Sequence, residues 1–448
     1  MDDERMNDAE RNRNKAELRS RVLETSDDEY RRSLLKHRLL YVWIIVAILV
    51  IVLGLLAYWI YRRNIRHFDG CKVTKSMQLG MTGTYEYEPY MDNVVFYGKN
   101  GISYLNASGE VVWTKAYEMT KPIIQKSGKF VAVADQGSST IVICDDTGWQ
   151  GTVTTELPIS RIALADQGMV AAVVEGEVAN YIHFYNKVGT KLNIDIKTVI
   201  SGDGYPLAID LSPSGETLMV SNVSVEGEGV KNKILFYNFA VGQDHVDKLI
   251  GGFEHYEDTL IPRVHFFNNK SAVAVGQDCI TFYRFPKENT VEIAREYRIK
   301  KEEKKTAGAE NAEANAETEE DKNEYMISNS LIAPEIRSVV ANDSYIGFVF
   351  SEEAREASRH LVVYDTAGKK AADVAFDMDY DRIAFSEENE EILIYNRSSL
   401  AVYYFDGSVK FKQSMENNYD IVLSGDDKNQ YYSVGNDVFQ VLTPYLSD

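Results

Sequence analysis

The sequence predicts an all-β protein, a β-propeller of eight four-stranded blades that is preceded by one transmembrane helix. Three observations lead to this prediction: an uncharged apolar stretch at 39–61, the near absence of helical periodicity after it, and a strand pattern that recurs about every 40–50 residues. The repeat count favours eight blades and leaves seven open.

The apolar stretch at 39–61 reads LLYVWIIVAILVIVLGLLAYWIY. As a helix it is about 34 Å long, enough to cross a hydrocarbon core of about 30 Å. A single uncleaved span is expected instead of a cleaved signal peptide, because a long charged tail precedes the stretch and two arginines follow it in place of a small-residue cleavage site. The residues expected at the two membrane interfaces are aromatic or basic: Tyr41, Trp43, Tyr58, Trp59, Tyr61, Arg62 and Arg63.

The orientation follows from the tail at 1–38, which is short and densely charged. Basic residues flank the stretch almost equally on both sides, so they do not decide the orientation. Large domains after a signal anchor are translocated largely regardless of charge. We therefore expect a cytoplasmic tail at 1–38, a transmembrane helix at 39–61, a short tether at 62–70 and an extracytoplasmic propeller at 71–448.

The repeated unit is a strand, a turn, a second strand that reaches an aromatic residue, and a polar turn with glycine. NVVFYGKNGISYLNASGE at 93–110 is the first copy. The last position before each polar turn marks the eight copies: Leu105, Cys144, Tyr185, Tyr237, Tyr283, Tyr364, Tyr404 and Val441. Each unit is a small sheet that buries its two apolar faces only by packing against neighbouring units, which is typical of a propeller.

Two segments depart from the repeat. The last copy ends after three strands near Val441, and CKVTKSMQLG at 71–80 is expected to add the missing outer strand and close the ring. The wide interval between Tyr283 and Tyr364 contains a segment, 300–328, that begins KKEEKKTAGAENAEANAETEEDKN. With so few apolar side chains it is expected to be a disordered acidic insertion.

The blades resemble those of known propellers. GKNGISYLNASGEVVWTK at 98–115 is similar to blades of quinoprotein-type propellers, and IDLSPSGETLMVSN at 209–222 and IAFSEENEEILIYN at 383–396 resemble WD40-like and TolB-like blades. The whole plan looks like an uncharacterised family of single-pass, membrane-anchored propellers of Gram-positive bacteria. Quinone-dependent relatives carry a vicinal cysteine pair and metal ligands in the central funnel. Three isolated cysteines depart from that pattern, so no cofactor is expected.

The charge balance limits the classes of partner. The chain has a formal net charge of −20, and the acidic excess lies beyond the apolar stretch. Such a domain is repelled by phosphate backbones and by anionic lipid, so nucleic acid is not expected as a partner. The odd number of cysteines argues against a disulfide framework, and Cys144 and Cys279 lie in apolar runs typical of buried thiols.

The candidates for metal ligands are Asp377, Asp379 and Asp381 in FDMDYDRIAF. Alternating carboxylates begin a calcium loop, and Glu388 stands at the twelfth position. The sixth position, however, is Arg382, where such loops need glycine, and IAF reads as a strand. We therefore interpret the three aspartates as an acidic connection between blades. The histidines show no zinc spacing, and no nucleophile or phosphate-loop motif appears.

These observations favour a non-enzymatic binding or scaffold module for a cell-envelope protein or polysaccharide, held at the lipid bilayer by 39–61. A transmembrane sensory subunit that signals through its tail is one alternative. A hydrolase, lyase or cofactor-dependent enzyme that uses the central funnel is the other.

Overall fold

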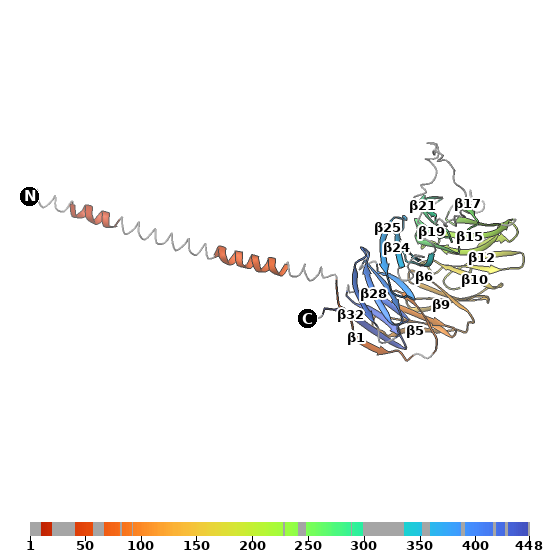
Figure 1. The fold of residues 1–448 in the computed structure, drawn as a ribbon, viewed down its shortest axis with the longest axis horizontal. Coiled ribbons are helices and arrows are strands. Elements are labelled where there is room, and N and C mark those ends of the chain that lie inside the picture. Colours follow the sequence, from red (N-terminus) through yellow and green to blue (C-terminus); the bar gives the residue numbers. More distant parts are fainter. Residues whose placement is uncertain are drawn as a thin grey trace, which may run out of the picture. The chain divides into compact units, whose positions relative to one another are not determined.

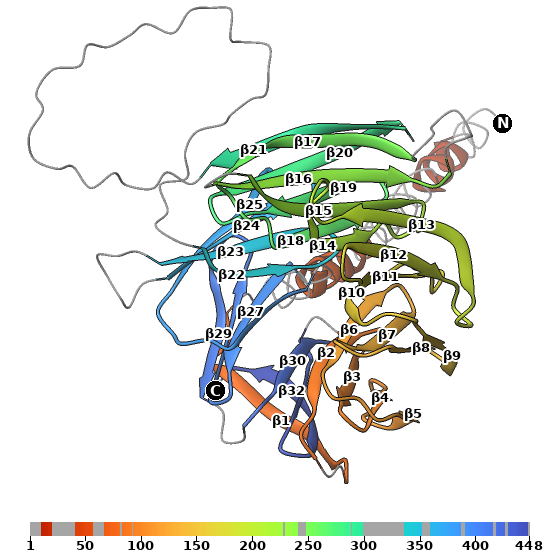
Figure 2. The ribbon, with the colours of Figure 1, turned by 90° about the vertical axis from the view of Figure 1, so that its right-hand side faces the viewer.

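The computed structural model describes residues 10–19, 41–56, 67–80, 83–91, 93–226, 229–240, 248–287, 289–298, 336–351, 359–386, 390–414, 418–425 and 429–446. The chain divides into two compact units, Met1–Arg66 and His67–Asp448. Figure 1 shows the chain with its strands labelled, and Figure 2 shows the second unit from another side.

The first unit contains two described helices, at 10–19 and 41–56. The second helix lies inside the apolar stretch, and its Tyr41 and Trp43 are exposed. Within the described ranges, neither helix combines the length and apolar character needed for a membrane span. The other predicted interface residues, Tyr58, Trp59, Tyr61, Arg62 and Arg63, lie outside the described residues.

The second unit is a propeller of eight four-stranded antiparallel sheets, so eight blades are confirmed and seven is wrong. Blades 1 to 4 comprise β2 (Glu86–Tyr90), β3 (Asn93–Gly98), β4 (Gly101–Leu105), β5 (Val111–Ala116); β6 (Pro122–Ser127), β7 (Phe130–Asp135), β8 (Thr140–Asp145), β9 (Gly148–Thr154); β10 (Ile159–Leu164), β11 (Val170–Glu175), β12 (Ala179–Tyr185), β13 (Lys191–Val199); β14 (Tyr205–Leu211), β15 (Thr217–Glu226), β16 (Gly229–Asn238) and β17 (Leu249–Glu257).

Blades 5 to 8 continue the same order, and the last blade takes its outer strand from the start of the unit. They comprise β18 (Arg263–Asn268), β19 (Ser271–Val275), β20 (Cys279–Lys287), β21 (Thr290–Arg298); β22 (Ile336–Ala341), β23 (Tyr345–Ser351), β24 (Arg359–Asp365), β25 (Lys370–Phe376); β26 (Arg382–Ser386), β27 (Glu391–Asn396), β28 (Ser399–Tyr404), β29 (Val409–Ser414); β30 (Ile421–Ser424), β31 (Tyr431–Gly435), β32 (Val438–Tyr445) and β1 (Gly70–Gln78). The predicted insertion at 300–328 lies outside the described residues.

The hydrophobic pattern of each strand matches its place in the blade. The second strands β7 and β11 are apolar almost throughout and buried on both faces. The fourth strand β13 alternates between exposed and half-buried residues, because only one of its faces packs against the blade next to it. The eight marker positions of the repeat all lie on the third strand of their blades.

Hydrophobic clusters hold neighbouring blades together. The described core residues form eight clusters, and each cluster joins two adjacent blades. One of them packs Phe96 and Leu105 of blade 1 against Val434 and Phe439 of blade 8. The ring is therefore closed by the same apolar packing that joins its other blades.

The polar turn of the repeat is an asparagine- or aspartate-capped turn between the third and fourth strands. In blade 1 the Asn106 side-chain oxygen accepts hydrogen bonds from the amides of Ser108 (3.0 Å) and Glu110 (2.9 Å). Gly109 has a φ of 83°, the left-handed region that glycine adopts without strain. Asn186 and Asp365 accept equivalent bonds in blades 3 and 6.

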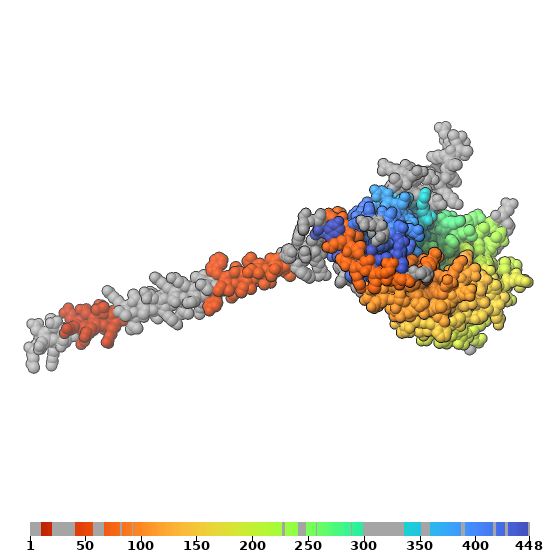
Figure 3. Space-filling model, turned by 90° about the horizontal axis from the view of Figure 1, so that it is seen from below, coloured from red at the N-terminus to blue at the C-terminus, as the bar shows by residue number. Residues whose placement is uncertain are grey.

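The outer strand of blade 8 is β1, as the sequence predicts for 71–80. It pairs antiparallel with β32, in a register that sets Gly70 opposite Tyr445 and Gln78 opposite Val438. Just before β1, the Phe68 amide donates to the Lys410 carbonyl (2.8 Å) on β29 of blade 7. Figure 3 shows the orange atoms of the start of the unit against the blue atoms of its end. One blade thus combines the two ends of the propeller sequence.

A buried ion pair lies at the junction of blades 7 and 8. The Lys410 ammonium is 2.6 Å from Glu391 Oε1, and both side chains are at most 2% exposed. The Tyr431 hydroxyl of blade 8 donates to Glu391 Oε2 (2.6 Å), and the Lys410 nitrogen also lies over the ring of Phe68. Burial and then the charge of Glu391 raise the pKa of Tyr431 well above its usual range, so this hydroxyl stays a donor.

All three cysteines are free and buried, as predicted for Cys144 and Cys279. Burial raises the pKa of Cys71 to about 11 and the pKa values of Cys144 and Cys279 to about 12. The thiolate form is therefore scarce near neutral pH, and these side chains contribute apolar packing.

Candidate functional site

A central channel of about 1070 Å³ runs through the propeller. Residues from the first strand of every blade line it, which identifies these strands as the innermost ones. Because all blades share one strand order, their first strands run in the same direction along the channel. The channel therefore has an amino end, where these strands begin, and a carboxyl end, where they finish.

Charged residues are distributed unevenly along this channel. Arg263 and Arg382 are the first residues of β18 and β26 and so belong to the amino end. Asp166 and Asp343 are two residues beyond the ends of β10 and β22, and Asp210 is near the end of β14, so these three carboxylates belong to the carboxyl end. Asp381, which directly precedes Arg382, also lines the channel, so the amino end carries both signs of charge, and the carboxyl end carries three carboxylates together with Lys126 near the end of β6.

Glu88 on β2 forms ion pairs with two of the cations in the channel. Its carboxylate lies 3.0 Å from the Lys126 ammonium and 3.7 Å from the Arg382 guanidinium. Lys126 also donates to the Pro89 carbonyl (2.9 Å), and Arg382 donates to the Tyr87 carbonyl (2.8 Å). These contacts tie the inner strands of blades 1, 2 and 7 together across the channel.

His265 on β18 links two neighbouring inner strands at the carboxyl end. Its Nδ1 is 3.5 Å from Asp210 Oδ2, and its Nε2 is 3.2 Å from the Asn342 carbonyl. Asp210 also accepts hydrogen bonds from the amides of Phe266 (2.7 Å) and Leu211 (2.9 Å). Burial acts to lower the pKa of His265, but Asp210 and the Asn342 carbonyl outweigh it and raise the pKa above 6.5.

We expect the stability that His265 contributes to fall as the pH rises. A histidine whose pKa is raised by folding stabilises the folded state fully below its unfolded pKa of about 6.5, and this stabilisation is lost as the pH passes the folded pKa. Urea unfolding of the wild type and of His265→Gln should therefore show a difference in unfolding free energy that is larger at pH 5.5 than at pH 8.5. A difference that stays constant or grows with pH would contradict this assignment.

Four charged residues of the channel lining have no ion-pair partner among the described residues: Asp166, Arg263, Asp343 and Asp381. The Arg263 guanidinium donates only to the Val339 carbonyl (2.8 Å), and burial lowers its pKa. Asp166 accepts a hydrogen bond from the Ser127 hydroxyl (2.6 Å). Burial is the largest effect on Asp343 and raises its pKa; the charges of His265 and Lys126 oppose this shift, whereas the carboxylates of Asp166 and Asp210 add to it. These are the groups that remain available to a ligand.

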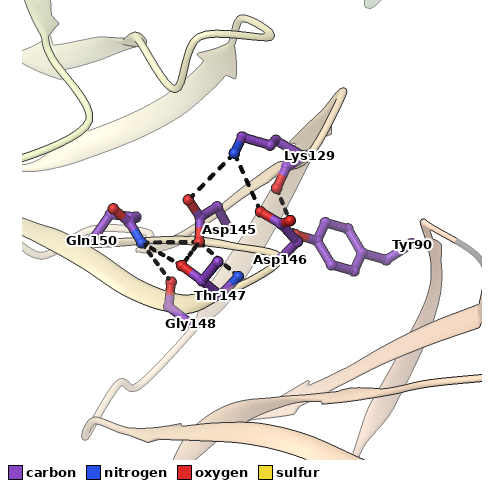
Figure 4. A network of polar contacts seen from close by, with 7 residues as sticks. All are labelled: Tyr90, Lys129, Asp145, Asp146, Thr147, Gly148 and Gln150. Atoms are coloured by element: carbon purple, nitrogen blue, oxygen red, sulfur yellow. Dashed lines mark hydrogen bonds and ion pairs between the residues drawn. The ribbon is translucent and has the colours of Figure 1, made fainter.

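A polar network fixes the rim of the channel at blade 2 (Figure 4). Tyr90, which lines the channel, donates through its hydroxyl to the Lys129 carbonyl (2.6 Å). The Lys129 ammonium lies 3.4 Å from Asp146 and 4.0 Å from Asp145. Asp145 in turn accepts from both the amide (2.8 Å) and the hydroxyl (2.6 Å) of Thr147. Two turns of blade 2 are thereby held against the inner strand of blade 1.

A second, smaller hollow of about 350 Å³ lies on blade 3. Its lining comes from two turns and a strand of that blade: Gln167, Met169, Asn186, Lys187, Val188 and Leu192. It contains one charged side chain and is formed by a single blade. The central channel, to which every blade contributes, is therefore the stronger candidate site.

The candidate metal ligands lie in the connection between blades 6 and 7, as predicted. Asp377 pairs with Lys412 (3.2 Å) and Asp379 pairs with Arg359 (2.6 Å), whereas Asp381 lines the channel beside Arg382. The described part of the chain contains no group of three or more potential ligands that could hold a metal ion. The following IAF is part of strand β26, as its pattern indicates.

The sequence interpretation missed the charged residues of the channel. They belong to different blades and follow no local motif. One signal was present: an acidic or amide residue follows several inner strands, as in ALADQG at 163–168 and VVANDS at 339–344. Aligning the repeats on their first strands, instead of on the polar turn, would have grouped Asp166 with Asp343.

Several solved structures are similar to this chain at low sequence identity. Sqt1 from Chaetomium thermophilum has a TM-score of 0.47 and 9% identity over 83% of this chain and 98% of its own. A eukaryotic initiation factor has a TM-score of 0.45 and 11% identity over 78% and 80%. Kuenenia stuttgartiensis hydrazine synthase has a TM-score of 0.39 and 10% identity over 83% and 98%.

No curated protein matches the sequence. A family model, described as a family of unknown function (DUF5711), matches residues 64–330 and 318–443, which together cover the propeller almost completely. The chain therefore belongs to the DUF5711 family.

Proposed function

We propose that the protein is a membrane-anchored, extracytoplasmic binding module that holds a cell-envelope protein or polysaccharide and catalyses no reaction. The observation that carries this proposal is the central channel. Its volume of about 1070 Å³ is at the upper end of the range typical of ligand sites, and all eight blades contribute to its lining. Some of its charged side chains have no ion-pair partner among the described residues, which favours binding of a polar or charged group.

The apolar stretch at 39–61 supports the membrane anchor. The described helix at 41–56 exposes a continuous set of large apolar side chains, for example Ile45 and Leu49, which water solvates poorly. Lipid would cover such a surface, and the aromatic residues that flank the stretch suit the interface. The short, charged segment at 1–38 supports placing the tail in the cytoplasm.

The chemistry of the described nucleophiles supports binding over catalysis. The three thiols are buried and their pKa values are raised, which disfavours the reactive thiolate. His265, the histidine of the channel, has both ring nitrogens engaged by Asp210 and Asn342. A ligand that enters the channel therefore meets fixed charges and hydrogen-bonding groups.

In-cell photo-crosslinking tests this function with the full-length chain in its native host. A photoreactive amino acid replaces Gln125, an exposed residue of the channel lining, or Val225, which is 76% exposed and outside that lining. We expect the protein in the membrane fraction, with its propeller open to added protease, and one reproducible envelope partner crosslinked from position 125 and not from position 225. A protein found in the soluble fraction, or equal crosslinks from both positions, would overturn the proposal.

A further inference from the structure

The central channel and the smaller hollow of blade 3 are separated by a single turn. Leu164 and Asp166 line the channel, whereas Gln167 and Met169 line the hollow. We call this segment, residues 164–169 at the end of β10 and the start of its connection to β11, the ridge. The rest of the hollow comes from the turn after β12 and from β13, and β12 runs in the same direction as β10. The channel mouth and the hollow therefore belong to one face of the propeller, at the carboxyl end of the channel.

Contacts from both neighbouring blades hold the ridge in place. The Ser127 hydroxyl of blade 2 donates to Asp166 Oδ1 (2.6 Å) on one side. On the other side, the Asp166 amide donates to the Pro213 carbonyl (2.9 Å) of blade 4. The Gln167 side chain donates to the Ser214 carbonyl (2.8 Å) of the same blade. A surface that is fixed before binding loses less conformational freedom when a partner docks on it.

The hollow, on the outer side of the ridge, favours an apolar group. Met169 and Leu192 pack on the core cluster between blades 3 and 4, and Val188 is 55% exposed. The side-chain oxygen of Asn186 already accepts hydrogen bonds from two amides of its own turn (3.2 and 2.9 Å). The one charged residue of the hollow, Lys187, is exposed and repels a cation. A partner therefore gains by burying a large apolar side chain here.

The channel mouth, on the inner side of the ridge, favours a cation. Asp166 is exposed and has no ion-pair partner among the described residues. Lys126 and His265, the basic residues of the lining toward this end, are engaged by Glu88 (3.0 Å) and Asp210 (3.5 Å). A lysine or arginine brought to Asp166 would therefore meet a carboxylate that no described cation already pairs with. Such a contact is a charge-assisted hydrogen bond.

We propose that a protein partner docks across the ridge, with a lysine or arginine side chain beside Asp166 and a large apolar side chain in the hollow of blade 3. This inference rests on the proposed binding function, specifies its partner as a polypeptide, and assigns the docking face to the carboxyl end of the channel. A neutral polysaccharide supplies neither a cation nor a large apolar side chain, so it would leave both sides of the ridge unused. Because the ridge is a single turn, the two side chains lie close together in the partner.

Photo-crosslinking from position 125, with the full-length chain in its native host, tests this docking face. Asp166→Asn removes the charge on the inner side of the ridge, and Val188→Gln removes an exposed apolar group on the outer side. Each should lower the yield of the crosslinked protein about fivefold or more, because each removes one of the two anchoring contacts. The matched controls, Glu177→Gln and Val178→Gln, change exposed residues between β11 and β12 of the same blade, at the opposite end of the channel. Both controls should crosslink as the wild type does.

Conservative variants separate the contacts from a general disturbance of the turn. Asp166→Glu keeps the charge and Val188→Leu keeps the apolar surface, so each should retain most of the crosslinking. Thermal unfolding confirms that each variant is folded. A wild-type yield from either Asp166→Asn or Val188→Gln would overturn the inference, and so would a crosslinked species that is a polysaccharide.

A charge exchange tests the cation of the partner directly. Mass spectrometry of the crosslinked peptide locates the partner segment, in which each lysine or arginine is then replaced by glutamate. One of these partner variants should crosslink weakly to the wild type and regain crosslinking with Asp166→Lys. If none of them does, the ionic contact is wrong.

The same measurements separate this inference from the binding function on which it rests. If the crosslink from position 125 forms in the wild type and the ridge variants leave it unchanged, docking across the ridge fails and the binding function stands. If no crosslink forms from position 125, both fail.

Discussion

Replacing Lys410 by methionine is expected to lower the free energy of unfolding by about 3–5 kcal/mol. The substitution leaves the Glu391 carboxylate buried, with the Tyr431 hydroxyl as its remaining described partner. A buried charge without its counter-ion is among the least favourable features that a single substitution creates. Chemical denaturation of the full-length protein, followed by circular dichroism, measures the change.

Lys412→Met is the matched control for this prediction. Lys412 lies on the same strand, two residues away, and pairs with Asp377, but both side chains are at least half exposed. Its removal should cost less than about 1 kcal/mol. Adding Glu391→Gln to Lys410→Met should recover part of the lost stability, because the amide carries no charge. If Lys410→Met is no more harmful than Lys412→Met, the buried pair does not stabilise the junction of blades 7 and 8.

Interrupting β1 is expected to have an effect of similar size, because it opens the ring. In the double variant Lys75→Pro/Ser76→Pro, one of the two adjacent amides faces β32, so a ladder hydrogen bond is lost whichever way the strand is turned. The cost should be several kcal/mol, and the amides of β32 should exchange with solvent faster. Hydrogen exchange measured by mass spectrometry resolves the change along the chain.

The double variant Lys75→Val/Ser76→Val controls for the lost side chains. It removes the contact from Lys75 to the Ser108 carbonyl (2.9 Å) and the one from Gln440 to Ser76 (3.5 Å), as the proline variant does. It keeps both amides, and valine favours strands, so it should unfold close to the wild type. Equal protection of β32 in the proline and valine variants would show that β1 does not hold the ring closed.

The architecture was predictable because its determinants are local and repeated. Each blade has its own apolar runs, and several blades have a capped turn such as Asn106 to Glu110, so the same signal recurs along the chain. The closing strand was predictable for a related reason: a copy that ends after three strands needs a fourth, and 71–80 was the segment left over. The strand pattern of one blade and the number of its copies together predict the closed ring.

The candidate site was not predictable in the same way. Asp166, Arg263 and Asp343 belong to blades 3, 5 and 6, and only the closed ring brings them to one channel. Their spacing along the sequence reflects the lengths of the intervening blades and carries no information about chemistry. Asp377 and Asp379 attracted notice because they are close in sequence, yet they pair with the cations Lys412 and Arg359. Closeness in sequence is therefore a poor guide to a site whose residues come from different blades and meet only in the closed ring.

The composite last blade also determines when this protein can finish folding. β1 is made early and β32 is made last, so β1 has no partner strand until the chain is complete. Until then the apolar face of blade 1 that packs on Phe439 and Val434 stays uncovered, and an uncovered face of this kind promotes aggregation. Such long-range pairing slows folding. A ribosome-bound chain whose synthesis is unfinished would therefore benefit from chaperones that cover this face.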